Sequence, residues 1–189
     1  MEIYAHAKVI TGILVGLALT HLLKALARLV QHPGRLKLYW VHLVWVVFAF
    51  FYVISFWWWE FRLEKLPSWT FPLYLFVTMY TVLLYFLCAL LMPRDLAEYN
   101  GFRDYFYSRR RWFFGVMAAI YVVDWFDSMI KGPEHLQFLG TNYSWTELGS
   151  LVCSIIAMRA QSVRFHAAFA VGSTLLQGSH FLWLFTLRA

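Results

Sequence analysis

Charged residues are scarce in this sequence. Only 14% of its 189 residues are charged, whereas a soluble domain carries about a quarter. A chain that is 61% hydrophobic and 21% aromatic lacks the polar surface that folding in water requires. The composition therefore excludes a sizeable soluble module and predicts a single polytopic membrane domain over residues 1–189.

Cysteine and enzyme motifs are also scarce or missing. Cys88 and Cys153 fit no metal-binding spacing, and helical rise separates them in depth by about 15 Å, too far for a disulfide. The sequence has no HExxH zinc motif, phosphate loop, nucleophile elbow or TVGYG potassium filter. These absences favour a protein that is not an enzyme without deciding the question, and no cofactor is predicted.

Long hydrophobic runs are what the sequence does contain. About 20 residues at ~1.5 Å each match a ~30 Å hydrocarbon core. Glu2 and Lys8 precede the first run without a basic n-region or cleavage site, so we expect a retained helix and not a signal peptide. We predict an all-α bundle of six transmembrane helices, at about 9–29, 38–59, 71–92, 112–130, 145–161 and 165–187.

Two segments are less regular. Only 148–158 of the fifth run is free of charge, so it crosses only if Glu147 and Arg159 lie at opposite interfaces; a re-entrant or interfacial segment is the alternative. Residues 94–111 mix charges with apolar positions at helical spacing, which predicts an interfacial helix between the third and fourth spans.

The positions of Lys and Arg predict the orientation. Cytoplasmic loops carry an excess of these residues. With the amino terminus outside, 11 of the 16 fall on the inner side, namely Lys24, Arg28, Arg35, Lys37, Arg94, Arg103, Arg109, Arg110, Arg111, Arg159 and Arg164. The other five are Lys8, Arg62, Lys65, Lys131 and Arg188. Both termini are then outside, and we expect a bacterial cytoplasmic (inner) membrane.

Two aspartates stand inside the fourth run. Asp124 and Asp127 lie three residues apart and share one helical face, and a charge within hydrocarbon costs about 3 kcal/mol even on the mild insertion scale. Spans four and six run in the same direction, so helical rise places Asp124 and Gln177 at about 18 Å from the inner boundary, and Asp127 and His180 at about 22 Å. We predict that these helices are neighbours and that the pairs stack in two polar layers. His21 should lie within about one turn of the Asp124 layer.

The polar layers have three interpretations. Asp127 and His180 could fix helix packing as a hydrogen-bonded pair, or handle protons or small ions in a site that opens outward. A metal site would add His6 or Glu147 to them, an oxygen and nitrogen set suited to zinc, manganese or iron. The outer mouth of such a site would be ringed by His6, Lys8, Glu60, Glu147 and Lys131.

Histidines at other depths raise the alternative of haem. Membrane bundles hold haem between histidines on facing helices. His21, His42 and His166 lie on predicted spans. Separate contacts with backbone carbonyls or headgroups are the more ordinary interpretation of these three side chains.

The first span combines a basic stripe with small residues. His21, Lys24 and Arg28 follow one face toward the cytosol, and Arg109, Arg110 and Arg111 are predicted near the same surface, where they would contact anionic lipids or anchor the helices. Gly12 and Gly16 form a GxxxG motif, which permits close helix approach. Contact within the chain is favoured over dimerisation.

The sequence therefore predicts a small transporter or channel that handles protons or small ions through an outward-opening Asp/His site. One alternative is a non-catalytic accessory or scaffold subunit of a larger membrane complex. Another is a membrane-embedded metal- or haem-binding enzyme or redox protein. The expected partners are the bilayer and its anionic lipids, and a homo-oligomer or larger complex is left open. Because the cations gather at predicted helix ends, nucleic acid is not expected.

Overall fold

The computed structural model describes residues 2–32, 37–93 and 97–187. These residues form seven α-helices and one 3₁₀ helix, and no β-strand occurs among them. In chain order the helices are α1 (Glu2–Gln31), α2 (Trp40–Trp59), η1 (Glu60–Lys65), α3 (Phe71–Leu91), α4 (Phe102–Ile130), α5 (Pro133–Leu139), α6 (Tyr143–Ala157) and α7 (Val163–Leu187). The prediction of an all-α protein is confirmed.

Glycine and proline set several of the boundaries. Pro72 occupies the first turn of α3, where a missing N–H leaves no hydrogen bond unmade. Gly132, with φ +91°, follows α4, and Pro133 then starts α5. Gly101 precedes α4 with φ +119°, and a Cβ there would lie 2.8 Å from Lys37 Cβ. Only glycine therefore permits the close approach at which Phe102 N–H donates to the Lys37 carbonyl.

Four helices are long and apolar enough to cross a membrane: α1, α2 with η1, α3 and α4. The fifth predicted span corresponds to α6, whose 15 residues rise only about 22 Å. The sixth corresponds to α7, which has 25 residues. The structure is therefore that of a helical membrane protein, and the count of six spans stays a prediction.

The interfacial helix predicted over 94–111 is not confirmed. Residues 102–111 form the first turns of α4, which continues unbroken to Ile130. Arg109 and Arg111 are exposed at this end of the helix, so their charges interrupt the apolar run without ending the helix. Three of the cations used to predict the orientation, Arg35, Arg94 and Arg188, lie outside the described residues.

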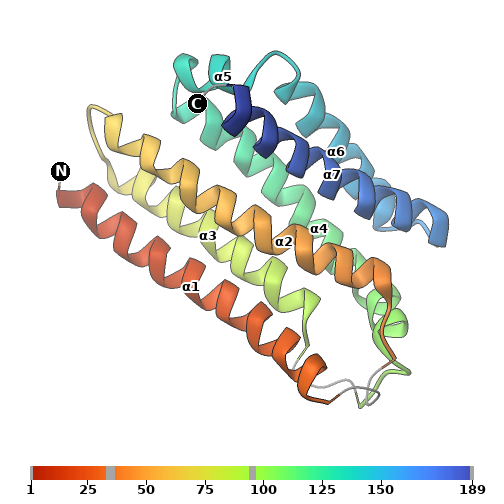
Figure 1. Cartoon of the computed structure of the whole chain (residues 1–189). Helices are drawn as coiled ribbons and strands as arrows, with labels where there is room; N and C mark the ends of the chain where they lie inside the picture. Colours follow the sequence, from red (N-terminus) through yellow and green to blue (C-terminus); the bar gives the residue numbers. More distant parts are fainter. Residues whose placement is uncertain (1, 33–36, 94–96, 188–189) are drawn as a thin grey trace.

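The long helices lie side by side, and both chain ends lie toward the same end of the bundle (Figure 1). α1 packs chiefly on α3, α4 packs on α6 and α3, and α7 packs chiefly on α2. α4 and α7 also meet, since the Phe114 ring of α4 lies 5.4 Å from the His166 ring and 5.9 Å from the Phe169 ring of α7, although α2 and α6 are the principal neighbours of α7. An aromatic cluster fills the centre, where fully buried Trp45 packs edge-on against Phe113, Phe114 and Phe169.

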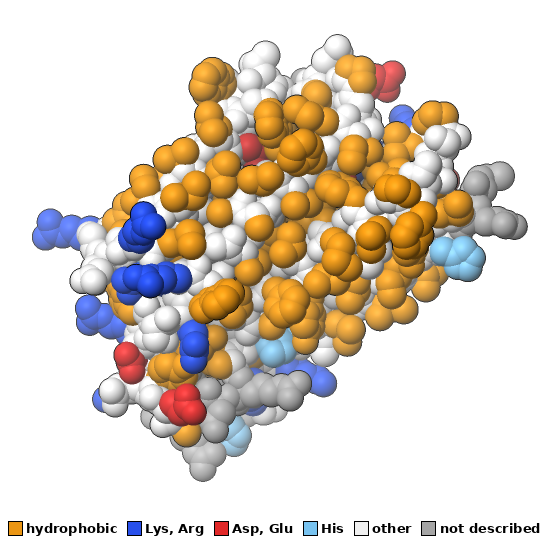
Figure 2. Space-filling model, turned by 180° about the vertical axis from the view of Figure 1, so that it is seen from behind, with side chains coloured by type: hydrophobic (Ala, Val, Ile, Leu, Met, Phe, Trp, Pro, Cys, Tyr) orange, Lys and Arg blue, Asp and Glu red, His pale blue; other side chains and the backbone are white. Residues whose placement is uncertain are grey.

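The outer surface of the bundle fits a lipid environment. Large apolar side chains such as Phe51, Phe86, Leu175 and Leu182 are exposed along the helices. Figure 2 shows apolar side chains spread over one face of the molecule, with most of the visible Lys and Arg side chains at one end. A monomeric soluble protein rarely exposes a contiguous apolar surface of this kind.

Candidate functional site

A cavity of about 670 Å³ lies between α2, α4, α6 and α7, beside α5. Its polar lining includes three carboxylates, Asp124, Asp127 and Glu147, and one ammonium group, Lys131. Apolar and aromatic side chains complete the wall, among them Phe48, Tyr52, Phe56, Trp59, Tyr121, Leu176 and Phe181. A concave, largely apolar space with a few converging polar groups is typical of a small-molecule or ion site.

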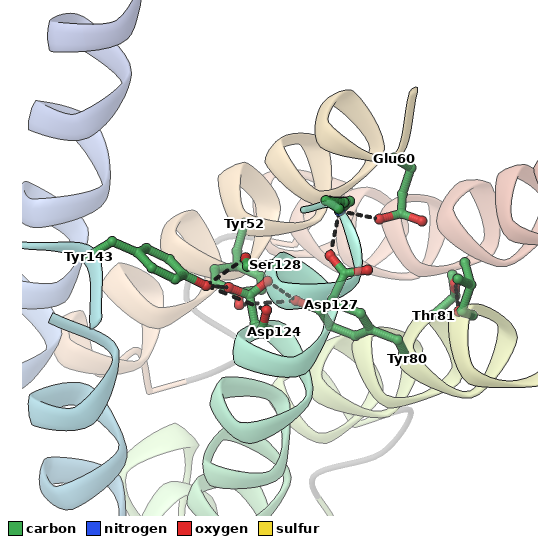
Figure 3. A network of polar contacts seen from close by, with 10 residues as sticks. Tyr52, Glu60, Tyr80, Thr81, Asp124, Asp127, Ser128 and Tyr143 are labelled. Atoms are coloured by element: carbon green, nitrogen blue, oxygen red, sulfur yellow. Dashed lines mark hydrogen bonds and ion pairs between the residues drawn. The ribbon is translucent and has the colours of Figure 1, made fainter. Parts of the chain in front are cut away.

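Asp124 is held by two tyrosines from other helices (Figure 3). Tyr80 of α3 donates to Asp124 Oδ1 at 2.5 Å, and Tyr143 of α6 donates to Oδ2 at 2.7 Å. The hydroxyl of Tyr52 lies 3.3 Å from that of Tyr80, and Ser128 Oγ lies 2.8 Å from the Tyr143 hydroxyl. Both oxygens of this carboxylate are therefore hydrogen-bonded, and the network joins α2, α3, α4 and α6.

Asp127 belongs to a second group of contacts, one turn further along α4. Lys131 Nζ donates to Asp127 Oδ2 and, at 2.8 Å, to Glu60 Oε1 at the start of η1 (Figure 3). The Lys131 and Asp127 side chains are 2% and 3% exposed, and that of Glu60 is 9% exposed. One buried ammonium is thus shared by two buried carboxylates, which leaves an excess of negative charge.

Two carboxylate oxygens at the cavity carry no hydrogen bond from any described residue. They are Asp127 Oδ1 and Glu147 Oε2, and both atoms are buried. A buried acceptor without a donor costs about 1–3 kcal/mol, and more when it is charged. Native proteins retain few such groups, so these two oxygens are the strongest local indication of a ligand or a bound proton.

Helix α5 covers the cavity at the end where α4 finishes. His135 packs against Trp59 with ring centroids 5.5 Å apart, and Arg62 lies 4.5 Å over the Phe138 ring. Burial, followed by the nearby charges of Lys131 and Arg62, lowers the pKa of His135 to about 3. This imidazole is therefore neutral at physiological pH and adds no positive charge to the cavity.

The structure brings four of the predicted site residues to this cavity: Asp124, Asp127, Gln177 and His180. The partners of three of them differ from the prediction. Asp124 binds tyrosines and Asp127 binds Lys131. With its amide oriented to suit its neighbours, Gln177 donates to the Phe48 carbonyl at 3.3 Å and accepts from Tyr52 N–H at 2.9 Å. The hydrogen bonds of Asp124 and Gln177 thus run to α2, α3 and α6, and the pairing of Asp127 with His180 stays a prediction.

His21 lies apart from this cluster. Its Nε2 is 2.7 Å from the Met92 carbonyl, at the far end of α3 from Phe71. Because α1 begins at Glu2, seven residues before the predicted span, His21 lies deeper along its helix than the prediction assumed. By helical rise, Met92 is about 18 Å from Tyr80, the partner of Asp124. The placement of His21 beside the Asp124 layer is therefore wrong.

The alternative metal and haem sites are not assembled. Within 2–32, 37–93 and 97–187, no group of three or more His, Cys, Asp or Glu side chains is placed to hold a metal ion. Glu147 lines the cavity, but His6 is exposed on α1 and is not among the lining residues. The histidines considered for haem each contact a backbone carbonyl instead, His42 at Leu91 and His166 at Ala160.

The predicted lipid contacts lie on the surface. Lys24, Arg28, Arg109 and Arg111 are exposed, whereas Arg110 is half-buried. Arg109 donates to the Tyr99 hydroxyl at 2.7 Å, and Arg110 donates to the Tyr107 carbonyl at 2.9 Å while its guanidinium lies 5.6 Å from the Tyr107 ring. Contact of this group with anionic lipids stays a prediction.

Sequence reasoning missed several functional neighbours of the aspartates. Lys131 was predicted only at the outer mouth, although its i+4 spacing from Asp127 marks a helical ion pair. Tyr80 and Tyr143 had no comparable signal, because they stand 44 and 19 residues from Asp124 in the chain.

Comparisons of the chain with protein-family models, curated proteins and solved structures find no match. The function is therefore argued from the cavity itself.

Proposed function

We propose that the protein is a small membrane transporter or channel that handles protons or small cations through this cavity. The observation that carries the proposal is the pair of unbonded, buried carboxylate oxygens, Asp127 Oδ1 and Glu147 Oε2, at the wall of one cavity. A carboxylate that lacks donors in such a place is stabilised when it binds a proton or a cation. Lys131 is the only Lys or Arg among the described lining residues, so the site favours positive charge.

The proposal assigns different roles to the two aspartates. Asp124 has both oxygens bonded to tyrosines, so it orders α3, α4 and α6 and contributes negative charge. Asp127 and Glu147 each keep a buried oxygen without a hydrogen bond, and these two residues bind the ion. This division combines the packing and the ion-handling interpretations of the polar cluster, because each aspartate serves one of them.

The proposed topology has six spans with both termini outside. Successive long helices alternate in direction, which puts the cavity, at the end of α4 near Ile130, toward the outer side. The cations at 103–111 then lie at the inner side, as cytoplasmic segments favour. A bacterial cytoplasmic membrane is the expected location.

A liposome assay tests this function. Purified protein is reconstituted with pyranine trapped inside, a potassium gradient with valinomycin sets an inside-negative potential, and internal pH is followed. We expect acidification above that of protein-free vesicles. Glu147→Gln should reduce its rate at least tenfold, while Glu64→Gln, which alters an exposed carboxylate at the same end of the molecule, should leave the rate unchanged.

Two results would contradict the proposal. Acidification no faster than in protein-free vesicles, with protein that retains its helical spectrum, would contradict proton transport. A matching lack of flux with sodium or potassium as the only permeant cation would then contradict transport of small cations. Flux that survives Glu147→Gln at full rate would place the pathway elsewhere. Co-purification with another membrane protein, without flux, would favour the scaffold alternative.

A further inference from the structure

The cavity is larger than a bare ion needs. A water molecule takes a share of about 30 Å³ in the liquid, and small-molecule sites span about 300–1,000 Å³. At about 670 Å³, this space falls within the range of small-molecule sites. An occupant with a body of several heavy atoms would fill it, whereas a proton or sodium ion would leave most of it to water.

The residues that line the cavity favour an occupant that is both positively charged and partly apolar. Three lining carboxylates face one ammonium, Lys131, which is itself shared with Glu60 outside the cavity lining. Phe48, Phe56, Phe181 and Tyr121 provide aromatic surface beside these acids. Aromatic faces attract cations electrostatically, and an organic cation satisfies both features at once.

The two carboxylate oxygens without a hydrogen bond favour a ligand that carries N–H donors. Asp127 uses Oδ2 for Lys131 and leaves Oδ1 unbonded, and Glu147 leaves Oε2 unbonded within the described part of the chain. Asp127 is only 2% exposed. A protonated primary amine carries three N–H donors on one nitrogen, whereas a quaternary ammonium carries none.

We propose that the cavity binds a small protonated organic amine. Its ammonium group donates to the unbonded Glu147 Oε2, and its apolar body packs against the aromatic wall. The inference rests on the proposed function, because it names the cation class that the same site handles.

Charge balance then links amine binding to proton release. A buried carboxylate without a counter-charge holds a proton, so Glu147 is the neutral acid in the empty cavity. When the ammonium ion binds, the Glu147 O–H bond breaks, the proton leaves to solvent, and the carboxylate pairs with the ammonium. One cation enters for each proton released. The titratable and charged groups that line the cavity with Glu147 are Tyr52 of α2, Tyr80 of α3, Tyr121, Asp124 and Asp127 of α4, Lys131 just after it, His135 of α5, Tyr143 of α6 and His180 of α7.

The test uses 2-phenylethylammonium chloride and the full-length protein in detergent. Isothermal titration calorimetry compares it with 2-phenylethanol, which is neutral, with phenylacetate, which is an anion, and with trimethyl(2-phenylethyl)ammonium, which lacks N–H groups. We expect the primary ammonium to bind at least tenfold more tightly than each of these. Titrations in buffers of different ionisation enthalpy should show close to one proton released for each amine bound.

Two variants assign the site. Glu147 Oε2 carries no hydrogen bond from a described residue, so Glu147→Gln removes the ionisable group while the fold is retained, which an unchanged melting temperature would verify. This variant should weaken amine binding at least tenfold and abolish proton release, whereas Glu64→Gln should change neither.

The outcomes separate this inference from the proposed function. Equal binding of the amine and the alcohol, or full binding by folded Glu147→Gln, overturns the amine site even where liposomes still acidify. Tight amine binding with proton release but no flux supports the site and removes only the transport proposal. Equal binding of the quaternary ammonium overturns the role of the N–H donors.

Discussion

At the scale of single residues, Lys131 is the position at which a substitution should destabilise the site most. Its ammonium is buried between Glu60 and Asp127, and both carboxylates depend on it for neutralisation. Breaking a buried ion pair by removing one partner leaves an uncompensated charge, whereas removing the charges together is far milder. The stability of this region therefore depends on matched charges more than on their number.

The first prediction concerns the balance of charge between Lys131 and its two carboxylate partners. Lys131→Met should lower the free energy of unfolding by about 3–5 kcal/mol, because it leaves Glu60 and Asp127 without a cation. The double variant Lys131→Met/Asp127→Asn should recover part of this loss. Urea unfolding in mild detergent measures both, with Lys65→Met at an exposed site as control. Additive effects in this cycle would show that the two side chains are not coupled.

His135 predicts how the free energy of unfolding depends on pH. Its pKa in the folded protein is lowered to about 3, against about 6.5 in an unfolded chain. Between these values the unfolded state binds more protons, so stability falls as pH decreases from about 6.5, by about 1.4 kcal/mol per pH unit. His135→Phe keeps a ring against Trp59 and should flatten this slope, whereas His6→Phe, at an exposed position, should not. Equal slopes for wild type and His135→Phe would contradict it.

The sequence predicted the polar residues of the site better than their partners. Asp124, Asp127, Gln177 and His180 do meet at one cavity, since a polar side chain in an apolar helix needs a polar environment. Their partners could not be read from spacing, because equal depth does not say which faces of two helices meet. Gln177 contacts the backbone of α2, a group that every residue has and no sequence pattern marks.

At the scale of helices, the contact of α1 with α2 accounts for one glycine of the GxxxG motif. A methyl group built on Gly12 would lie 3.0 Å from Trp57 Cη2, whereas one on Gly16 would meet nothing within 4 Å. The two glycines are thus not equivalent: Gly12 accommodates an indole from the same chain, and Gly16 leaves space open. The expected contact within the chain is present at Gly12.

This difference predicts unequal effects of alanine at the two glycines. Gly16→Ala should raise the free energy of unfolding by roughly 0.5–1 kcal/mol, because alanine favours a helix over glycine. Gly12→Ala should show little or none of that gain, because Trp57 must shift to admit the methyl group. Thermal melts of the two variants in one detergent make the comparison. A gain in stability at Gly12 as large as that at Gly16 would show that the Trp57 side chain shifts without a cost in free energy.

At the scale of the whole molecule, helix positions follow from the sequence but helix neighbours do not. The bilayer fixes the length of an apolar run, so α2 and α3 begin and end within two residues of the predicted spans. Lipid and protein interior are equally apolar, so hydrophobicity alone does not say which face of α7 meets α2 and which meets lipid. The continuation of α4 through Arg109 was missed for a related reason, since long basic side chains reach water from within a helix.

The topological prediction is that both termini are outside. Alkaline phosphatase fused after Ala189 should be active, and green fluorescent protein at the same position should be dark, because only the former folds in the periplasm. A fusion after Met158 should give the reverse result if α6 crosses. A cytoplasmic carboxyl terminus would instead mean that α6 lies within one leaflet, in keeping with its short rise.

The pairing of α1 with α3 also constrains how the protein is made. Residues 32–70 separate the two helices, so the ribosome completes α1 well before its main partner exists. Ala18 and Leu22, fully buried in the finished bundle, face lipid or an insertion factor during that interval. Membrane insertion of α1 therefore precedes its packing, and α1 supplied as a separate peptide should dock onto a chain that begins at α2.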